Sequence, residues 1–536
     1  FSDGSRKTFS AMIIGSGTLA IQCAEILLNL RHRLVAVASS DMSVSTWAAK
    51  KGVPCYAPND TLSEKITEPV DYLFSIVNDH ILSGDILQIP KELAINYHDA
   101  LLPRYAGTHA TSWAIINGET QHGVTWHCVG ERVDAGDILE QQSVEIGAGD
   151  TAFTLNTKCF EAAIRSFGTL VDSLAVESYE RTPQDLTKRT FFPRFKRLPN
   201  GGLIDWNTSA DKISSIVRGL SFGRHPNPLG TPKVDIAGEY FIVSKVEILD
   251  EHSRSPAGVI CGIGDTSIDV STADTNLRLT KIHSLAGQVV DLTELVKRLG
   301  RKIGQPLSET CQPLDARFMS AVKVESALVH KLHAIEPAPV PLASNTGPVN
   351  DGSFGSLKFR VPEVFAAFSH QKRADMSLPD VVCSAFGVLL ARLNGSFNFL
   401  VGFDASSIAP KVTNEESLFV TNLPFHFDID AREGFDTLLD STKREFESIR
   451  TVPFFMADIF WRYPQIRPLA ADMLLNGIPV TISMNPDLPE YHPTSANALS
   501  MLISDNGEGY WVYNSAMIKP DEVLRLDRYF NSLLRS

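Results

Sequence analysis

The chain has 536 residues, of which 43% are hydrophobic and 21% are charged, so its composition is that of a globular protein. This length exceeds what a single hydrophobic core fills, and we expect two to four domains. The formal net charge of −13 arises from 49 basic and 62 acidic side chains. An overall acidic chain offers no general field for a phosphate backbone, so we expect no nucleic-acid partner.

Cysteine usage and hydropathy indicate the compartment. The seven cysteines show no Cys-x-x-Cys pair and no disulfide or zinc spacing, which favours a reducing environment and predicts no metal site. No apolar run approaches the roughly 20 residues that span a bilayer. The first ten residues lack both an initiator Met and an apolar signal region. We therefore expect a cytoplasmic protein with no membrane partner, and a piece of a longer chain.

The first 182 residues read as one α/β domain. An apolar strand over 11–14, a helix over 21–30 and a strand over 34–37 form a βαβ unit. A helix over 45–51 and strands over 72–77 and 93–96 continue the alternation. This pattern predicts a Rossmann-like parallel sheet covered by helices.

A glycine turn follows the first strand. Gly15-Ser16-Gly17 and the later Asp41 fit the dinucleotide fingerprint, but Ala20 stands where that fingerprint has its third Gly. A tight turn into a helix and a cofactor cradle both remain open, and the tight turn is favoured.

The composition and the pattern of predicted elements change after residue 182. Short β-like runs over 240–249, 258–261, 267–271 and 277–282, with a helix over 210–220, predict a small barrel within residues 183–310. Residues 337–355 are rich in Pro, Ser, Asn and Gly and predict a linker or long loop. In the third unit, residues 311–536, a helix is predicted over 379–393 and strands over 399–403, 423–429 and 478–484.

Polar side chains gather where the strand over 93–96 ends. Asn96 and His98 are two residues apart, so on an extended strand they point to the same side. The carboxyl edge of a parallel sheet is where α/β proteins place their sites. Downstream, residues 123–127 form another strand, and Asp134 follows on a loop. Considered one at a time, His98 is more often explained as a structural histidine and Asp134 as a turn residue.

Taken together, these motifs resemble the formyltransferases that use 10-formyltetrahydrofolate. The family has an Asn-x-His strand end, a Leu-Leu-Pro loop, a Gly-Val-Thr strand and an Asp-x-Gly-x-Ile loop, and this chain has each in order, with Asp134 36 residues after His98. The resemblance covers residues 10–306. It includes Ile204-Asp205-Trp206 before a helix, as in the OB-like barrel of transferases acting on methionyl-tRNA and amino sugars.

The resemblance implies roles for these residues. Asn96 would donate to the developing oxyanion, His98 would donate and move protons, and Asp134 would hold the His98 ring. The folate would contact the chain at His80, Ile81 and Leu82, at Thr108, and at Gly130, Glu131, Arg132, Val133 and Asp134. The resemblance also implies a cis Leu102-Pro103 bond.

One departure from the family concerns the acceptor. Many relatives have Ser after the His, where this chain has Asp99, and the Tyr105–His109 loop has no Arg after its Tyr. That loop faces the acceptor in the family, so the acceptor's identity stays open.

Residues 324–536 resemble the α+β C-terminal half of a condensation domain from nonribosomal peptide synthetases. The resemblance rests on residues 327–342 and 381–395, on the 401–403 strand, and on the Thr421–Pro424 and Val452–Phe454 segments. The catalytic HHxxxDG of that family is missing, because the chain contains no His-His pair. We expect a catalytically silent platform that the barrel or a downstream adenylation domain covers. Deleting residues 324–536 should leave formyl transfer to a free small acceptor largely intact but weaken the use of an acceptor delivered by the rest of the synthetase.

The sequence thus predicts an enzyme, a formyltransferase at the start of a nonribosomal peptide synthetase. Its donor would be 10-formyltetrahydrofolate, and its acceptor an amino acid, free or on a phosphopantetheine carrier. An adenylation domain would follow residue 536. The alternatives are a formyltransferase for methionyl-tRNA, an amino sugar or a siderophore hydroxylamine, and a non-catalytic scaffold.

Overall fold

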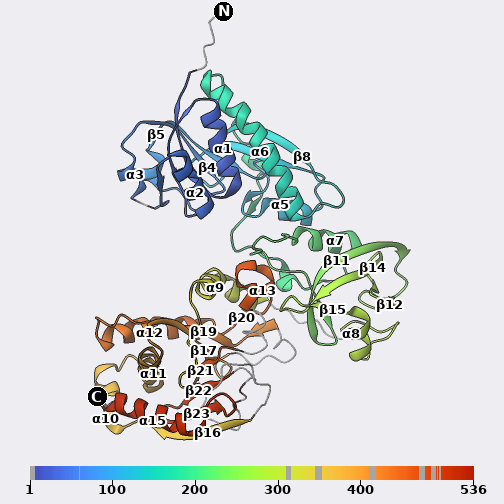
Figure 1. Ribbon diagram of the computed structural model, residues 1–536. Coiled ribbons are helices and arrows are strands. Elements are labelled where there is room, and N and C mark those ends of the chain that lie inside the picture. Colours follow the sequence, from blue (N-terminus) through green and yellow to red (C-terminus); the bar gives the residue numbers. More distant parts are fainter. Residues whose placement is uncertain are drawn as a thin grey trace, which may run out of the picture.

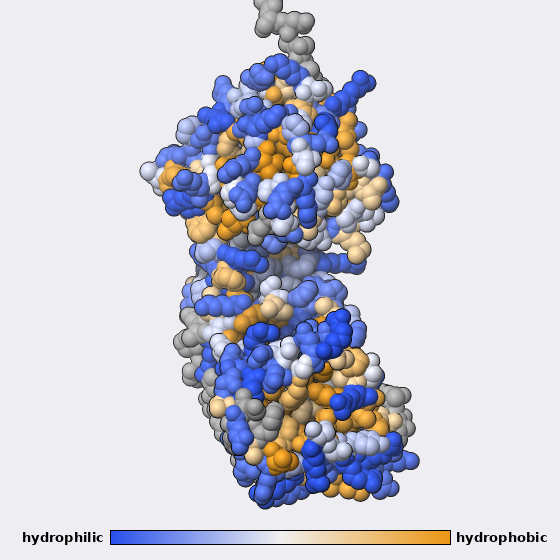
Figure 2. Space-filling model, turned by 90° about the vertical axis from the view of Figure 1, so that its left-hand side faces the viewer, coloured by the Kyte–Doolittle hydropathy of each residue, from blue (hydrophilic) through white to orange (hydrophobic). Residues whose placement is uncertain are grey.

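The computed structural model describes residues 7–59, 61–308, 315–343, 353–409, 418–469, 477–484, 491, 493 and 497–536. Figure 1 shows the N-terminal body at the top, a body of green strands below it on the right, and a third body at the lower left. Helices α9 and α13 lie near the centre, beside the green strands. In the side view the molecule narrows below the N-terminal body (Figure 2).

The N-terminal body is built on a seven-stranded sheet in the order β3-β2-β1-β4-β5-β7-β8. Its strands are β1 (Ser10–Gly15), β2 (Arg33–Ala38), β3 (Cys55–Tyr56), β4 (Val70–Ile76), β5 (Pro90–His98), β7 (Gln121–Cys128) and β8 (Ile138–Glu145). Its helices are α1 (Gly17–Asn29), α2 (Met42–Lys51), α3 (Leu62–Lys65), α4 (Gly84–Leu87), α5 (Ala110–Ile116) and α6 (Ala152–Ala175).

The continuous apolar run of β1 is explained by burial on both faces. Ala11 and Ile13 pack in the core formed with α1, α2 and α6. Met12 and Ile14 face the opposite way, into the core that includes Leu62 of α3 and Ile86 of α4. A strand covered on both faces has no need of polar residues between its apolar ones.

The glycine turn after β1 has a structural partner. Asp41 accepts hydrogen bonds from the Gly17 N–H at 2.8 Å and from the Ser43 N–H at 2.8 Å. It therefore caps α2 while tying down the start of α1. The carboxylate that would have served a dinucleotide is engaged with the chain itself.

The expectation of a parallel sheet is correct for five strands and wrong for two. The five neighbouring strands β3, β2, β1, β4 and β5 run parallel. Strand β7 pairs antiparallel with β5, and β8 pairs antiparallel with β7. Antiparallel strands at the edge of a mostly parallel sheet are common in α/β folds. The reversal matters for the site, because it brings His127 opposite Asn96.

The second body holds an antiparallel sheet in the order β10-β11-β14-β13-β12, with β15 on β14. Its elements are α7 (Ala210–Gly219), β10 (Lys233–Ile236), β11 (Glu239–His252), β12 (Ile260–Ile263), β13 (Ile268–Ser271), β14 (Thr275–His283), β15 (Val289–Val290) and α8 (Leu292–Arg298). Closure of this sheet into an OB-like barrel stays a prediction.

The third body has a mixed sheet in the order β16-β23-β22-β21-β17-β19. The strands of this body are β16 (Phe354–Arg360), β17 (Asn398–Asp404), β18 (Phe419–Val420), β19 (Asn422–Asp428), β20 (Phe455–Met456), β21 (Val480–Ser483), β22 (Leu499–Ile503) and β23 (Glu508–Asn514). Strands β18 and β20 pair with each other outside the mixed sheet. Its helices are α9 (Asp315–Ala334), α10 (Glu363–Lys372), α11 (Leu378–Asn394), α12 (Phe435–Thr451), α13 (Ile459–Arg462) and α15 (Pro520–Arg535).

The segment predicted as a linker over 337–355 is only partly one. Pro337 pairs with Leu400 of β17, and the Ala338 N–H donates to the Leu400 carbonyl at 2.7 Å. Ala338 is buried in the core of the third body, and Phe354 begins β16. Proline and small residues here pack on a strand edge, which composition alone does not reveal; residues 344–352 lie outside the described residues.

The second and third bodies share a buried ionic network. Lys233 of β10 meets Asp458 at 2.6 Å, and the side chains of both are 1% exposed. Asp458 also contacts Arg462 of α13 at 3.1 Å, and Arg462 pairs with Glu325 of α9 at 2.5 Å. The expected cover on the third body is thus the second body, joined through charges as well as apolar contacts.

Within the described residues, no helix is long and apolar enough to cross a membrane. The same residues contain no group of three or more side chains that could hold a metal ion.

Candidate active site

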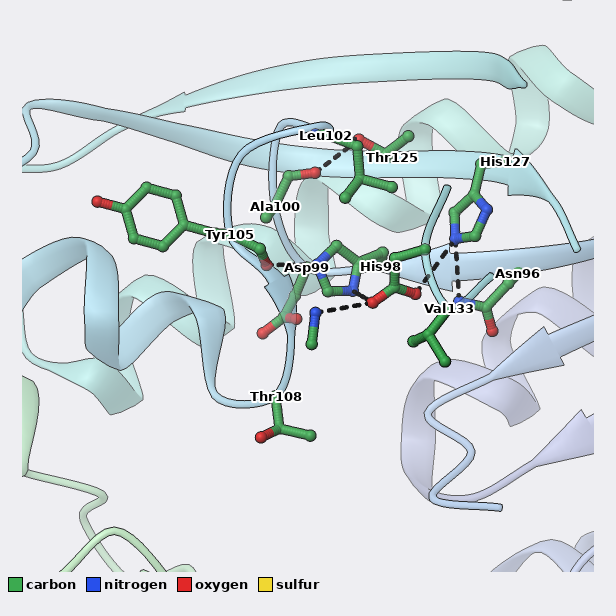
Figure 3. A network of polar contacts seen from close by, with 12 residues as sticks. Asn96, His98, Asp99, Ala100, Leu102, Tyr105, Thr108, Thr125, His127 and Val133 are labelled. Carbon is green, nitrogen blue, oxygen red and sulfur yellow. Dashed lines mark hydrogen bonds and ion pairs between the residues drawn. The ribbon is translucent and has the colours of Figure 1, made fainter. Parts of the chain in front are cut away.

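The site forms where β5 and β7 end side by side. Asn96 and His98 come from β5, and His127 from β7 lies directly opposite Asn96 in the antiparallel register. Asp134 reaches the same place from the loop between β7 and β8, within 4 Å of both His98 and His127. Figure 3 shows Asn96, His98 and His127 at this edge of the sheet. The structure thus brings the three predicted catalytic residues together and adds a fourth, His127.

His98 is fixed by a backbone carbonyl. Its Nε2 lies 2.8 Å from the Tyr105 oxygen, which can only accept a hydrogen bond, so Nε2 carries a proton. Nδ1 then faces Asp134 Oδ2 at 3.7 Å. The ring is buried, and its free nitrogen is the one that can take up a proton next to a carboxylate.

Asp134 is an ionised carboxylate in a buried setting. Burial raises the pKa of its carboxyl, but the neighbouring His98 and His127 rings and the Gly107 N–H outweigh this and lower the pKa to about 2. The Gly107 N–H donates to Oδ2 at 2.8 Å, and His127 Nε2 lies 3.6 Å from Oδ1. Asp134 therefore carries a full negative charge between two imidazoles.

Asn96 and His127 form a second pair. His127 Nδ1 lies 2.9 Å from the Cys128 carbonyl and must donate to it. In the neutral ring, Nε2 is then the acceptor for the Asn96 amide at 3.2 Å. Sequence reasoning placed His127 on its strand but gave it no role, because the antiparallel pairing that makes it Asn96's neighbour was not foreseen.

Two glycines allow the loops to approach this closely. Gly107 has φ of +101°, and a Cβ there would lie 2.2 Å from the Phe192 oxygen. A Cβ on Gly136, in the Asp-x-Gly motif, would lie 1.9 Å from the Cys128 oxygen. Both positions require glycine on steric grounds.

The Leu-Leu-Pro loop has the predicted cis Leu102-Pro103 bond. Thr125 fixes the loop from β7: its hydroxyl donates to the Ala100 carbonyl at 2.6 Å and accepts from the Leu102 N–H at 3.2 Å. Figure 3 shows the contact between Thr125 and Ala100 above the His98 ring.

The predicted folate contacts lie on neighbouring loops. Asn78 holds the His80 segment through hydrogen bonds to the His80 N–H and carbonyl, and Ile81 is 87% exposed. Val133 is 48% exposed, next to Asp134. Leu82 is half-buried, Gly130, Glu131 and Arg132 are exposed, and Thr108 follows Gly107 in the loop below His98.

This arrangement suits acyl-type transfer. An amide donor and an imidazole can stabilise an oxyanion, and an imidazole beside an ionised carboxylate can accept and return a proton. None of the four side chains is a strong nucleophile activated for covalent catalysis.

Two family models match the chain. Residues 56–169 match the formyl transferase model, and residues 198–300 match the model of the formyl transferase C-terminal domain. The first range contains Asn96, His98, His127 and Asp134. The chain therefore carries formyl transferase domains and is an enzyme of one-carbon transfer.

Solved structures of related type are also similar in part. The N-formyltransferase from Helicobacter canadensis, in complex with folinic acid and dTDP-3-aminofucose, is 19% identical with a TM-score of 0.43, over 51% of this chain and 99% of that one. A 4-N formyltransferase from Francisella tularensis is 17% identical with a TM-score of 0.36, over 42% and 92%. HypX from Aquifex aeolicus, in complex with tetrahydrofolic acid, is 13% identical with a TM-score of 0.38, over 57% and 50%.

Proposed function

We propose that this enzyme transfers the formyl group of 10-formyltetrahydrofolate to the amine of an amino acid, free or carrier-bound, at the start of a nonribosomal peptide synthetase. The observation that carries the transfer chemistry is the cluster of Asn96, His98 and Asp134 inside the residues that match the formyl transferase model. The folate fits the loops beside this cluster, because Ile81 and Val133 present exposed apolar side chains there.

The donor supplies the formyl carbon, bonded to its N10. Asn96 would donate to the formyl oxygen as negative charge develops on it. Its amide now donates to the Tyr97 carbonyl at 3.0 Å and to His127. One of these N–H groups would turn from its present acceptor to the substrate oxygen.

His98 would move the protons. Its Nδ1 can accept the proton that the attacking amine loses and return it to the departing nitrogen, while Asp134 stabilises the imidazolium. Asp134 itself stays ionised, because its pKa of about 2 lies far below neutral pH. The carboxylate is thus an electrostatic partner and not the proton carrier.

The third body supports the assignment to a synthetase. Its sequence resembles the C-terminal half of a condensation domain, and without a His-His pair it would act as a platform. The domains would be residues 1–182, 183–310 and 311–536. A downstream adenylation domain and a phosphopantetheine carrier would be the partners.

The test is a transfer assay with 10-formyltetrahydrofolate and a panel of acceptors, read by product mass. The panel holds free amino acids, aminoacyl-pantetheines, methionyl-tRNA, a nucleotide-linked amino sugar and an N-hydroxylated diamine. Formylated amino acid or aminoacyl-pantetheine is expected, with no product from His98→Ala. Product only from tRNA, the sugar or the hydroxylamine would replace the proposed acceptor, and no product from any would refute the function.

A further inference from the structure

A run of cations lies between the catalytic body and the second body. Residues 189–197, which we call the basic linker, contain Arg189, Arg194, Lys196 and Arg197 in a chain whose net charge is −13. The linker includes β9 (Phe191–Phe192), which pairs with β6 (Ala106–Gly107). The cations therefore flank the loop whose Gly107 N–H holds Asp134.

The linker cations are held by contacts that leave their charge uncompensated. Lys196 Nζ lies 4.4 Å from the centre of the Phe192 ring and 5.3 Å from that of Trp113. Arg197 Nη1 donates to the carbonyls of Arg194 and Lys196. In the described part of the chain, no carboxylate forms an ion pair with any of the four cations.

Two guanidinium N–H groups of the linker are buried and have no acceptor among the described residues. They are the Nε atoms of Arg189 and Arg197. Buried donors in folded proteins nearly always have a partner, so these two N–H groups are available to an ion or ligand. Arg189 also donates to the Val133 carbonyl at 2.9 Å, next to Asp134.

The surrounding charges leave the linker positive. Asp134 is the acidic group near Arg189, where Arg132 adds a second cation. Glu325 is the acidic group near Arg197, but Arg462 and the Tyr463 hydroxyl already occupy its carboxylate. Burial of the His109 ring, with Arg197 and Arg194 nearby, lowers its pKa to about 4, so that ring is neutral at pH 7.

We propose that Arg194, Lys196 and Arg197 bind a phosphate group of the formyl acceptor. The inference rests on the proposed formyl transfer and names a chemical feature of its substrate. A phosphate offers several charged oxygens to several cations at once, and guanidinium forks match its geometry. Lys196 lies over the rings of Phe192 and of Trp113 in α5, and Arg197 donates to the Lys196 carbonyl. Apart from Thr108, the predicted folate contacts lie on the His80 and Gly130 loops, so the phosphate is assigned to the acceptor.

Two acceptor types carry such a phosphate: an aminoacyl group on a phosphopantetheine arm, and a nucleotide-linked amino sugar. The test measures binding to the full chain by titration calorimetry with three probes: 4′-phosphopantetheine, pantetheine and dTDP. The first two differ only in the phosphate. Binding of the phosphorylated probe at least tenfold tighter than pantetheine is expected, with the affinity falling as salt rises.

The variants separate recognition from folding. Arg194→Gln/Lys196→Gln removes two exposed cations and should abolish the preference for the phosphorylated probe. Lys188→Gln is the matched control, because it removes a charge from the adjoining segment that Asp185 already pairs at 3.1 Å. Arg197→Gln is a second variant, read only after its thermal unfolding matches that of the parent.

The outcomes assign the source of the phosphate. Tight binding of 4′-phosphopantetheine identifies a carrier arm as the source, and tight binding of dTDP identifies a nucleotide sugar. The inference is overturned if pantetheine and 4′-phosphopantetheine bind equally and dTDP does not bind. It is also overturned if the double variant raises the KM for 10-formyltetrahydrofolate and not the KM for the acceptor. Formyl transfer that persists without phosphate preference refutes this inference alone, whereas phosphate binding without any transfer refutes the proposed function.

Discussion

The buried network between the second and third bodies gives a sharp prediction. Asp458→Asn keeps the size of the side chain and removes its charge. Lys233 and Arg462 would then share the single carboxylate of Glu325, which already binds Arg462. One buried cation remains without a counterion.

The expected loss of unfolding free energy follows from the distance between the two charges. At 2.6 Å, the attraction between Lys233 Nζ and Asp458 Oδ2 is about 6 kcal/mol at an effective dielectric constant of about 20. Relaxation and residual hydrogen bonding, including that from the Thr231 hydroxyl, reduce the loss. Removing one partner of a buried pair typically costs about 3–5 kcal/mol, and we expect a loss in that range.

The assay is urea unfolding of the full chain, followed by tryptophan fluorescence. Trp461 reports on this interface, because its ring lies 4.4 Å from that of His283. The double variant Lys233→Met/Asp458→Asn should recover most of the loss, since it removes the orphaned cation. Arg278→Gln is a control at an ion pair whose Arg side chain is 39% exposed, and it should cost about 1 kcal/mol or less.

The result that would refute the reasoning is a free energy of unfolding for Asp458→Asn within about 0.5 kcal/mol of the parent. Failure of the double variant to recover stability would show that the loss arises from something other than the unpaired Lys233.

Four further predictions concern the site and the third body. In steady-state assays, His98→Ala should lower kcat about 1000-fold and Asn96→Ala about 100- to 1000-fold, with unchanged circular dichroism; near-normal turnover would remove them from the mechanism. Because the folded pKa of Asp134 is about 2 against an ordinary 3.8, the stability that its charge contributes is complete at neutral pH and is lost as pH falls toward 2, so Asp134→Asn should flatten acid unfolding in that window. Gly136→Ala should cost about 1–3 kcal/mol and most activity, since its Cβ meets the Cys128 oxygen, whereas Gly149→Ala, with no atom within 4 Å, should change neither. Deleting residues 324–536 should leave formyl transfer to a free acceptor largely intact but lower the thermal stability of the second body, because it uncovers Lys233 and the apolar residues beside it; a folded truncated chain without any transfer would contradict this.

Local patterns predicted most of the catalytic body. The alternation of strands and helices, the Asn-x-His strand end and the Asp-x-Gly loop were all visible in sequence, because each depends on neighbouring residues. The role of His127 was not visible, since it depends on the direction in which β7 pairs with β5. Strand direction is set by tertiary packing, which short windows do not contain.

The contacts between the second and third bodies also could not be predicted from the sequence. Lys233 lies in none of the strands predicted from sequence, Asp458 follows 225 residues later, and no sequence pattern pairs the two. The linker expected over 337–355 failed for a related reason: Pro337 and Ala338 look like loop residues until β17 is known to lie beside them.

The pairing of Lys233 with Asp458 also limits how this chain can be recombined. A chimera that exchanges the third body at residue 311 would inherit one half of the network from each parent. The graft would fold only if the incoming segment supplied a carboxylate at the place of Asp458 and a Glu–Arg pair like Glu325 and Arg462. Engineers who transplant the formyl transferase domains should therefore move the junction beyond α13, or replace Lys233 with an apolar residue first.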